Sequence, residues 1–444
     1  MRMPEGKGRW AVTTALALAL SACGGGDGVD GGEVCTPAAE KAWAHAHLDD
    51  VYLWYKDIID VPPTNYKRVE DYFSALLVKP RDRFSFVTGK AAFDAFHETG
   101  ASVDYGVLWS YDPSLGNALR AEFIEPGSPA DAGGVHRGDI LVGVNGVSIG
   151  YIPNRELVRS LNPLPRERVE LILNDRSGLN FRYVTLYASE FIHQPVPRVS
   201  VLNRPDGSRV GYVLFNDHIR TATDGLAKAI AQLKAAGVSD VVLDLRYNGG
   251  GYLSVASQLA YMLSGPNTSG QVFGRLSYND KHTAENSVVP FIPYDNQGVD
   301  LPRLNLNRVY VLTDSRTCSA SESVINGLRP FMNVVLVGAS TCGKPYGFRQ
   351  TDYCDKAYFA VRLKMANQSG DSVPETGFTM DCPVRDDLQT PLGDEHEPLL
   401  SAALTMQANG SCPNAAAARM RSPTTAPPPM PLPRNPWREN LLDR

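Results

Sequence analysis

Residues 241–251 read VVLDLRYNGGG, a run of aliphatic residues followed by a polar turn and three glycines. An unbroken aliphatic run predicts a buried strand, and the glycines predict a tight turn from that strand into a helix. Similar units surround this stretch: further strands are predicted at 210–215, 308–313 and 333–338, and helices at 222–236, 253–263 and 320–328. This alternation predicts βαβ units on a largely parallel sheet, which gives an α/β core over residues 195–410.

Three of these strands are followed by residues of types that are suited to catalysis. They are Gly249, Gly250 and Gly251 after the strand at 241–245, Ser319 within TCSASE (317–322) after the strand at 308–313, and Lys344 within CGK (342–344) after the strand at 333–338. Sites in open α/β sheets form beyond the carboxyl ends of the strands. If the three strands are neighbours, a glycine-rich loop, a serine at a helix start and a lysine converge in one crevice.

Ser319 has two interpretations. Ser319-x-x-Glu322 is a capping-box pattern, so Ser319 fits the N-cap of the next helix. Alternatively Ser319 is a nucleophile, a role for which Thr317 and Ser321 compete on equal local grounds. Lys344 lies 25 residues after Ser319 and favours the second interpretation, because a serine hydroxyl needs a base. A lysine can act as that base if burial lowers its pKa from the usual ~10.4.

Acyl transfer also needs donors for the developing oxyanion. The Ala320 N–H at a helix N-terminus suits this role, and Gly250 suits it because glycine lets a substrate approach the backbone closely. Simpler interpretations remain: Lys344 as a solvated loop charge and the glycines as a turn only. His218, after the strand at 210–215, is the rival base.

Residues 101–190 predict a small β domain. A turn at 125–130 (EPGSPA) precedes GDILVGVNG (138–146), in which apolar residues alternate before an Asn-Gly hairpin turn. GVSIG (146–150) matches a nucleophile-elbow pattern, but we reject that interpretation because its serine follows this turn. The whole string resembles a PDZ domain. That resemblance implies binding of peptide C-termini by strand addition, with the terminal carboxylate on the loop around 103–107, namely Tyr105, Gly106 and Val107.

The motifs DLRYNGGG, TCSASE and Gly343-Lys344 together resemble the C-terminal processing (tail-specific) peptidases over residues 100–405. The resemblance implies a crotonase-like (ClpP-like) α/β core preceded by a PDZ-like domain, and a serine endopeptidase that uses a Ser/Lys dyad and no cofactor. By this resemblance Ser319 takes the nucleophile position and Lys344 that of the base. Ala320 and Gly250 take the positions of the oxyanion donors.

The chain departs from that family pattern beside the lysine. The family usually has a glutamine four residues after it, where this chain has Phe348, whereas Gln350 lies six residues after it. Either the loop is longer and Gln350 orients the lysine, or the orienting residue is lost. The second possibility favours an alternative function, a catalytically impaired peptide-binding scaffold of the same fold.

The N-terminus predicts export. Basic residues precede the apolar run AVTTALALAL (11–20), which is too short to span a bilayer. Leu20-Ser21-Ala22-Cys23 resembles a bacterial lipobox, so we predict a signal peptide at 1–22, lipidation of Cys23 and a glycine-rich tether at 23–35. An ordinary secretory signal is the alternative. Gly24 favours, by resemblance to lipoprotein sorting, an outer-membrane anchor facing the periplasm of the cell envelope.

Composition limits the remaining possibilities. The chain has 444 residues, 43% of them hydrophobic, and a net charge of −5, which argues against global disorder and against a nucleic-acid partner. The expected partners are protein or peptide substrates and, through the lipid, a membrane. Helical spacing of apolar residues predicts a helical domain at 36–100, and eight prolines predict a disordered tail at 413–444.

Cysteine usage adds one further expectation. Seven cysteines are an odd number, which lipidation of Cys23 explains. The other six are free to form disulfides after export, and Cys342 with Cys354 is the pair that we predict because they are close in sequence. Cys318 and Cys342 flank the dyad, and their two interpretations are a redox-sensitive pair and buried structural thiols; we favour the second. No CxxC or HExxH pattern occurs, so we expect no metal.

Overall fold

The computed structural model describes residues 35–413, apart from 113–117, 153 and 176–179. The predicted signal peptide, Cys23 and nearly all of the tether and the tail lie outside the described residues. Within the described part, no helix combines the length and apolar character needed to cross a membrane.

The core is built on a six-stranded sheet in the order β10-β11-β12-β15-β16-β21. β10 runs antiparallel to β11, and the other neighbours are parallel. The strands are β10 (Arg198–Asn203), β11 (Arg209–Leu214), β12 (Asp240–Asp244), β15 (Arg308–Thr313), β16 (Asn333–Gly338) and β21 (Cys382–Pro383). The predicted α/β class is confirmed, and β12, β15 and β16 are neighbours, so their carboxyl ends lie side by side.

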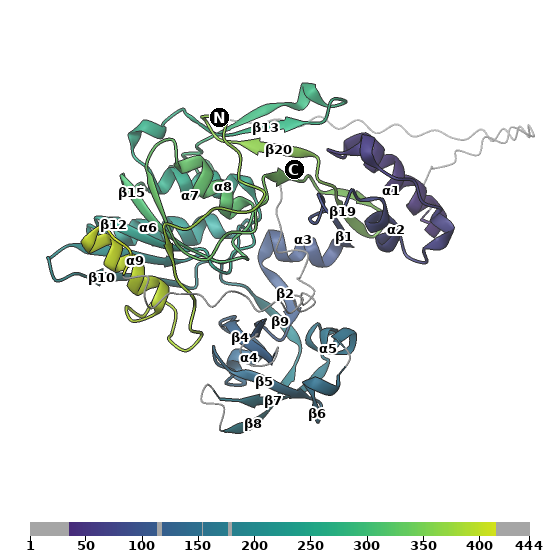
Figure 1. The fold of residues 1–444 in the computed structure, drawn as a ribbon, viewed down its shortest axis with the longest axis horizontal. Coiled ribbons are helices and arrows are strands. Elements are labelled where there is room, and N and C mark those ends of the chain that lie inside the picture. Colours follow the sequence, from purple (N-terminus) through teal and green to yellow (C-terminus); the bar gives the residue numbers. More distant parts are fainter. Residues whose placement is uncertain (1–34, 113–117, 153, 176–179, 414–444) are drawn as a thin grey trace, which may run out of the picture. The chain divides into compact units, whose positions relative to one another are not determined.

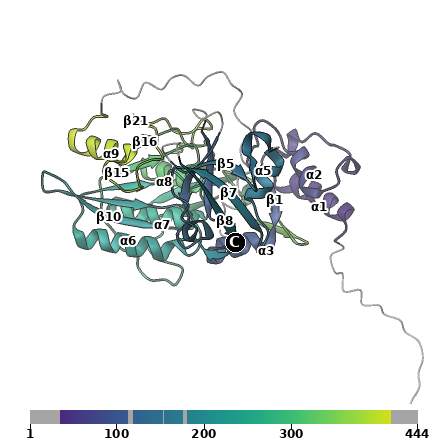
Figure 2. The ribbon, with the colours of Figure 1, turned by 90° about the horizontal axis from the view of Figure 1, so that it is seen from below.

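Helices cover both faces of this sheet (Figures 1 and 2). One face carries α6 (Ala222–Ala236), α7 (Leu253–Leu263) and α8 (Ala320–Leu328), and the other carries α9 (Pro398–Asn409). Side chains alternate between the two faces along β12. Val241 and Leu243 belong to the hydrophobic core on the face of α6, α7 and α8, and Val242 belongs to the core on the face of α9. The bounds of α6, α7 and α8 are those predicted from the sequence.

The PDZ-like module has a sheet in the order β3-β4-β5-β7-β8, with β6 paired to β5. Its core is formed by residues such as Trp109, Leu141 and Leu171. The elements are β3 (Val107–Asp112), β4 (Ala118–Ile124), α4 (Pro129–Ala132), β5 (Ile140–Val144), β6 (Val147–Ser148), α5 (Asn154–Leu161), β7 (Arg168–Asn174) and β8 (Phe181–Tyr187). β2 (Ala101–Asp104) and β9 (Ser189–Ile192) pair antiparallel where the chain enters and leaves this module (Figure 1).

Residues 36–100 hold more than helices. α1 (Pro37–Val51), α2 (Val69–Leu76) and α3 (Lys90–Thr99) are joined by β1 (Phe86–Gly89), which pairs with β19 (Lys356–Phe359). The prediction of an all-helical region was therefore incomplete. α1 ends at Val51, and the next residue, Tyr52, is extended.

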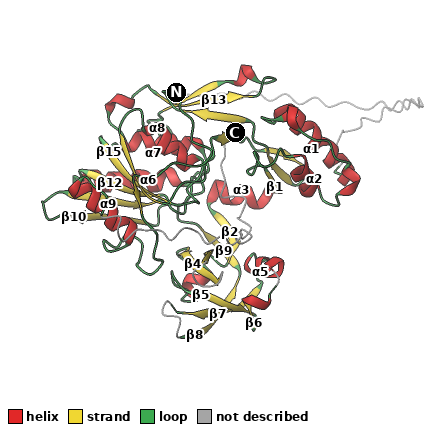
Figure 3. Cartoon of the chain, viewed as in Figure 1, coloured by secondary structure: helices red, strands yellow, loops and turns green. Residues whose placement is uncertain are grey.

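Two smaller sheets complete the structure (Figure 3). Their strand orders are β1-β19-β18 and β14-β13-β20-β17. The remaining strands are β13 (Val272–Tyr278), β14 (Ser287–Pro290), β17 (Tyr346–Gly347), β18 (Thr351–Tyr353) and β20 (Leu363–Ala366). β17 begins two residues after Lys344 and pairs antiparallel with β20.

All six described cysteines are disulfide-bonded. Cys318 bonds Cys342 and Cys382 bonds Cys412. The predicted Cys342–Cys354 pair was therefore wrong, and so was the interpretation of Cys318 and Cys342 as thiols. The reason is topological: β15 and β16 are adjacent and parallel, so the loops that follow them meet.

Candidate active site

A pocket opens beside the N-terminus of α8. It contains both Ser319 and Lys344, together with Ala320 and Gly251. The remaining lining is mostly apolar: Leu253, Ser323, Asn326, Pro345, Tyr346, Gly347, Leu363, Met365 and Val373. The convergence of the three strand ends thus brings the predicted serine and lysine into one concavity.

Ser319 is the N-cap residue of α8 and has an unusual backbone. Its φ is 52° and its ψ is −103°, a positive-φ conformation that a non-glycine residue adopts only under constraint from its surroundings. Its side chain borders the pocket, and the residue is only 7% exposed. Being an N-cap therefore does not remove Ser319 from the pocket, and the first interpretation of the sequence does not exclude the second.

The two rival hydroxyls are used elsewhere. The Thr317 hydroxyl donates to the Leu245 carbonyl at 2.9 Å, and the Ser321 hydroxyl donates to the Asn248 carbonyl at 3.0 Å. Both residues are fully buried, and neither lines the pocket. Among the three candidates, Ser319 alone borders the pocket.

Glu322 joins the serine segment to the lysine segment. One carboxylate oxygen accepts the Ser319 N–H at 2.8 Å and the Lys344 N–H at 2.9 Å. The other accepts the Thr341 hydroxyl at 2.6 Å and the Gly343 N–H at 2.8 Å. Burial raises the pKa of Glu322, while these four hydrogen bonds act in the opposite direction. The main chains of both candidate residues are thus fixed to a single carboxyl group.

Lys344 is buried among aromatic rings. The residue is 2% exposed, and its Nζ lies 3.8 Å from the centroid of Phe348 and 5.0 Å from that of Phe84. Phe348 stands at the sequence position where the resemblance led us to look for a glutamine, and its ring packs on the lysine amine. Nothing in the local sequence pointed to Phe84, which is more than 250 residues away in the chain.

Gln350 does not take the place of that glutamine. Its amide donates to Asp94 at 3.0 Å and to Asp352 at 2.7 Å, and it does not line the pocket. The prediction that a longer loop brings Gln350 to the lysine is therefore not met in this structure. Its amide group is bound by the carboxylates of Asp94 and Asp352 instead.

The glycine loop also differs from the prediction. The Gly250 N–H donates to Asn248 Oδ1 at 2.9 Å, so in this structure it is not available as an oxyanion donor. Gly251 lines the pocket instead. Gly251 has a φ of 136°, and a Cβ there would lie 2.3 Å from the His218 carbonyl oxygen, so only glycine fits. Ala320, the other predicted donor, is the first residue of α8 and lines the pocket.

His218 supports this loop and is poorly placed to act as a base. The ring Nδ1 lies 3.0 Å from Asn248 Oδ1. The backbone N–H of His218 donates to the Gly250 carbonyl at 3.1 Å, and its backbone carbonyl accepts the Tyr252 N–H at 2.7 Å. The residue is fully buried and does not line the pocket. Burial lowers the pKa of His218 to about 4.

The lowered pKa of His218 predicts a pH effect on stability. The pKa of His218 is 6.5 in the unfolded chain and about 4 in the folded chain. Between these two pH values the unfolded chain binds a proton at His218 and the folded chain does not. Stability therefore falls as the pH drops through this window, by about 2 kcal/mol at pH 5. The free energy of unfolding in urea is measured for wild type and for His218→Gln at pH 7.5 and at pH 5. The difference between the two proteins isolates His218, because the other titrating groups contribute equally to both. A difference that stays constant with pH would contradict this origin.

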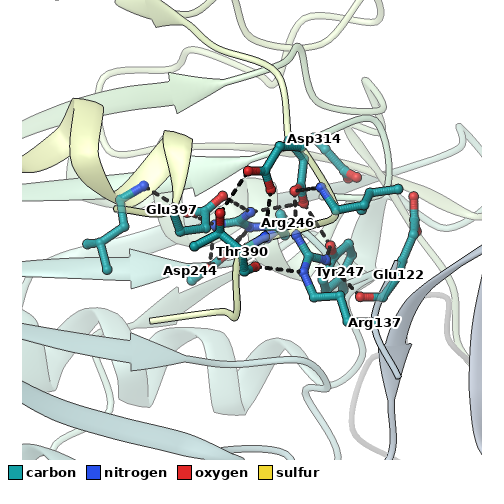
Figure 4. Close-up of polar contacts among 12 residues, drawn as sticks. Glu122, Arg137, Asp244, Arg246, Tyr247, Asp314, Thr390 and Glu397 are labelled. Atoms are coloured by element: carbon teal, nitrogen blue, oxygen red, sulfur yellow. Dashed lines mark hydrogen bonds and ion pairs between the residues drawn. The ribbon is translucent and has the colours of Figure 1, made fainter. Parts of the chain in front are cut away.

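Arg246 is the centre of a buried charge network behind the glycine loop (Figure 4). Its guanidinium donates to Asp244 at 3.0 Å and makes two bonds to Glu397 at 2.7 and 2.9 Å. A third partner is Asp386 at 3.0 Å, which also pairs with Arg137 of the PDZ-like module. The pairing of Asp244 with Arg246 thus fixes the turn at the end of β12, and the network also ties the PDZ-like module to the core.

The PDZ-like loop holds a carboxylate in this structure. The Tyr105 and Gly106 N–H groups both donate to Oδ1 of Asp104. Val107 begins β3, which is an edge strand with its second side unpaired within the described sheet. The loop at which we predicted binding of a peptide carboxylate thus presents two N–H groups to one oxygen, next to a free strand edge.

Two groups of described side chains have donor atoms close enough for a metal ion. Cys318 and Cys342 with Glu322 form one, but their disulfide removes both thiolates as ligands. The other is Glu125, His193 and Asp217, all buried where the PDZ-like module meets the core; His193 Nδ1 lies 2.9 Å from Glu125 Oε1.

The fold and pocket define an α/β protein with a buried serine–lysine pair at its strand ends and an attached peptide-binding module. Comparison with protein families shows what these segments resemble. Residues 209–384 match peptidase family S41, 39–86 match the peptidase S41 N-terminal domain, and 124–172 match a PDZ domain. The chain therefore contains three segments similar to domains found in S41 peptidases.

Relatives and solved structures agree with this. The chain is 26% identical over 219 residues to a carboxyl-terminal-processing protease of Picosynechococcus, covering 49% of each chain. It is 23% identical to the carboxy-terminal processing protease CtpA of Bacillus subtilis, covering 68% of this chain and 59% of that one. The chain thus spans about half to three fifths of the length of these relatives.

Two solved structures share the fold. A candidate S41 protease from Bacteroides fragilis has a TM-score of 0.68 and 26% identity, covering 83% of this chain and 97% of that chain. The photosystem II D1 C-terminal processing protease has a TM-score of 0.51 and 19% identity at the same coverage. The second likeness concerns the fold alone.

Proposed function

We propose that the protein is an exported serine endopeptidase that cleaves protein or peptide substrates with a Ser319/Lys344 dyad. The observation that carries the proposal is that Ser319 and Lys344 border one pocket, within the segment that matches the S41 peptidase family. The buried Glu322 carboxylate supports the proposal, because it accepts the backbone N–H groups of both residues and so fixes their main chains; we call this arrangement the Glu322 clamp.

In the proposed reaction the neutral Lys344 amine takes the proton of Ser319 Oγ as that oxygen attacks the substrate carbonyl carbon. The C–N bond of the tetrahedral intermediate then breaks, and the lysine returns the proton to the leaving amine. An acyl-enzyme ester on Ser319 remains. Lys344 next takes a proton from water as the water oxygen attacks the ester. The C–O bond to Ser319 then breaks, the lysine returns this proton to Ser319 Oγ, and the new carboxyl terminus is released.

Two features of the pocket support this chemistry. Burial disfavours the charged form of a lysine, and Lys344 is almost wholly buried. Ala320 begins α8, where the helix dipole and first-turn N–H groups favour a developing negative charge. The glutamine that the resemblance led us to expect is replaced by Phe348, whose ring positions the amine by contact rather than by a hydrogen bond.

The wall beside Ser319 indicates which substrates fit. Leu253, Leu363, Met365 and Val373 are apolar and surround the space next to the serine. A charged side chain would lose its hydration against these four side chains, whereas an apolar one would pack on them. We therefore propose that the residue before the cleaved bond is an uncharged, apolar one.

A peptide series tests the proposed function. In otherwise identical unstructured peptides, we expect Ala, Val or Leu before the cleaved bond to give a kcat/KM at least ~10-fold above Asp or Lys. Met365→Asp should reduce the apolar preference while leaving Ser319 in place. Equal cleavage of all peptides would contradict the assignment of the pocket. Peptide binding without any cleavage would favour the impaired scaffold instead.

The PDZ-like module is proposed to capture substrate segments. An extended peptide can add to the free edge of β3, with its terminal carboxylate on the Tyr105–Gly106 N–H groups. The geometry of the loop supports this assignment, since both N–H groups point to a single carboxylate oxygen, that of Asp104. Arg137 and its ion pair to Asp386 connect the module to the core beside the glycine loop.

We further propose that Cys23 is lipidated and anchors the protein in the cell envelope, at the outer membrane facing the periplasm. The lipobox-like sequence at 20–23 supports the anchor. The disulfide bonding of all six described cysteines supports an oxidising compartment, because disulfides are rare where thiols are kept reduced.

A further inference from the structure

The Cys318–Cys342 disulfide lies directly between the two candidate catalytic residues. Cys318 immediately precedes Ser319, and Cys342 is two residues before Lys344. Their Cα atoms are 5.2 Å apart, so the bond joins the serine segment to the lysine segment at close range. It is the covalent counterpart of the Glu322 clamp, which joins the same two segments by hydrogen bonds.

The backbone at Ser319 explains why a covalent bond matters there. A positive-φ serine is strained and persists only when its surroundings over-determine it. On one side of Ser319, helix α8 fixes the chain. On the other side, Cys318 is held by its disulfide and by hydrogen bonds of its N–H to the Asn248 carbonyl at 3.2 Å and of its carbonyl to the Ser321 N–H at 3.1 Å. Cutting the disulfide removes the only covalent cross-link of this segment and leaves the strained residue held on its N-terminal side by hydrogen bonds, including that of its own N–H to Glu322.

The loop that carries Lys344 is also bonded to the serine segment. Besides the disulfide and Glu322, the Cys342 N–H links the two by donating to the Thr317 carbonyl at 3.0 Å. Cys342 is half-buried, whereas Cys318 is 2% exposed. Cys342 is therefore the more exposed of the two cysteines, and a reductant would attack the disulfide from its side.

We propose that the Cys318–Cys342 disulfide is a positioning element for Ser319 and Lys344, and that its reduction by a dithiol reversibly lowers peptidase activity. One thiolate of the dithiol attacks Cys342 Sγ, forms a mixed disulfide and releases the Cys318 thiolate, which takes up a proton. The second thiol then displaces Cys342 as its thiol. The dithiol becomes a cyclic disulfide, and two electrons and two protons pass to the protein.

The inference rests on the proposed function, and a matched pair of variants tests it. Cys318→Ala/Cys342→Ala removes this disulfide, and Cys382→Ala/Cys412→Ala removes one that lies away from the pocket. We expect the first variant to lose kcat roughly 10- to 100-fold with KM nearly unchanged, as small misplacements of reacting groups do. The control variant should keep its kcat, even if its melting temperature falls.

A second measurement does not depend on how the variants fold. Native protein is reduced with dithiothreitol, the freed thiols are mapped by alkylation and mass spectrometry, and the rate of fluorophosphonate labelling of Ser319 is followed. Reduction of Cys318–Cys342 should slow labelling and cleavage together, and reoxidation should restore both. Full activity with Cys318 and Cys342 reduced would overturn the inference, as would equal losses of kcat in both disulfide variants.

The oxidised wild type separates this inference from the proposed function. If the oxidised protein cleaves peptides through Ser319 and reduction has no effect, only the positioning role fails. If the oxidised protein neither cleaves nor is labelled, the proposed function fails and the inference fails with it.

Discussion

Ser319→Ala is expected to abolish cleavage of a disordered substrate such as casein, with a loss in kcat of at least ~10³-fold. The substitution removes only the hydroxyl oxygen that borders the pocket, beside Lys344. Alanine tolerates the positive φ of this position about as poorly as serine does, so the variant should keep the stability of the wild type.

Ser321→Ala is the matched control for that result. Ser321 lies on the same helical turn, but its hydroxyl is bonded to the Asn248 carbonyl and does not reach the pocket. We expect this variant to retain cleavage within about tenfold of wild type, since a single hydrogen bond is lost. Equal cleavage by wild type and Ser319→Ala, or loss in Ser321→Ala alone, would show that the nucleophile is misassigned.

Lys344→Arg is expected to lower kcat by about 10²- to 10⁴-fold, the contribution of a general base. A guanidinium stays protonated at any working pH, so it carries a permanent charge and cannot accept the serine proton. The larger, planar group would also press on Phe348, which lies 3.8 Å from the lysine nitrogen.

Lys344→Met separates these two effects, because methionine matches the apolar stem without a base or a charge. Both variants should lose activity to a similar extent if the missing base is the cause. Substantial activity in either variant would point to a different base. His218 would then be the first candidate, although its burial and its bond to Asn248 argue against it.

The core was predictable from the sequence because its signals are local. Aliphatic runs followed by glycine or by polar turns define β12, β15 and β16, and Gly237 ends α6 in the left-handed conformation expected of a C-cap. Once these strands are placed side by side, the meeting of Ser319 and Lys344 follows from their position at the strand ends.

What the sequence could not show depends on contacts between distant segments. β1 pairs with β19, some 270 residues further along, so a region with helical periodicity also contains a strand. Phe84 reaches Lys344 over a similar separation. The pairing of Cys318 with Cys342, instead of the sequence neighbour Cys354, follows from strand adjacency in the same way.

The most direct test of the central claim is to label the oxidised protein with a fluorophosphonate and locate the adduct by mass spectrometry. The dyad predicts one adduct, on the Ser319 hydroxyl, which is absent in Ser319→Ala and strongly slowed in Lys344→Arg. An adduct on Ser321, Thr317 or any other residue, or no adduct in a protein that still cleaves peptides, would contradict the assignment of Ser319 as the nucleophile.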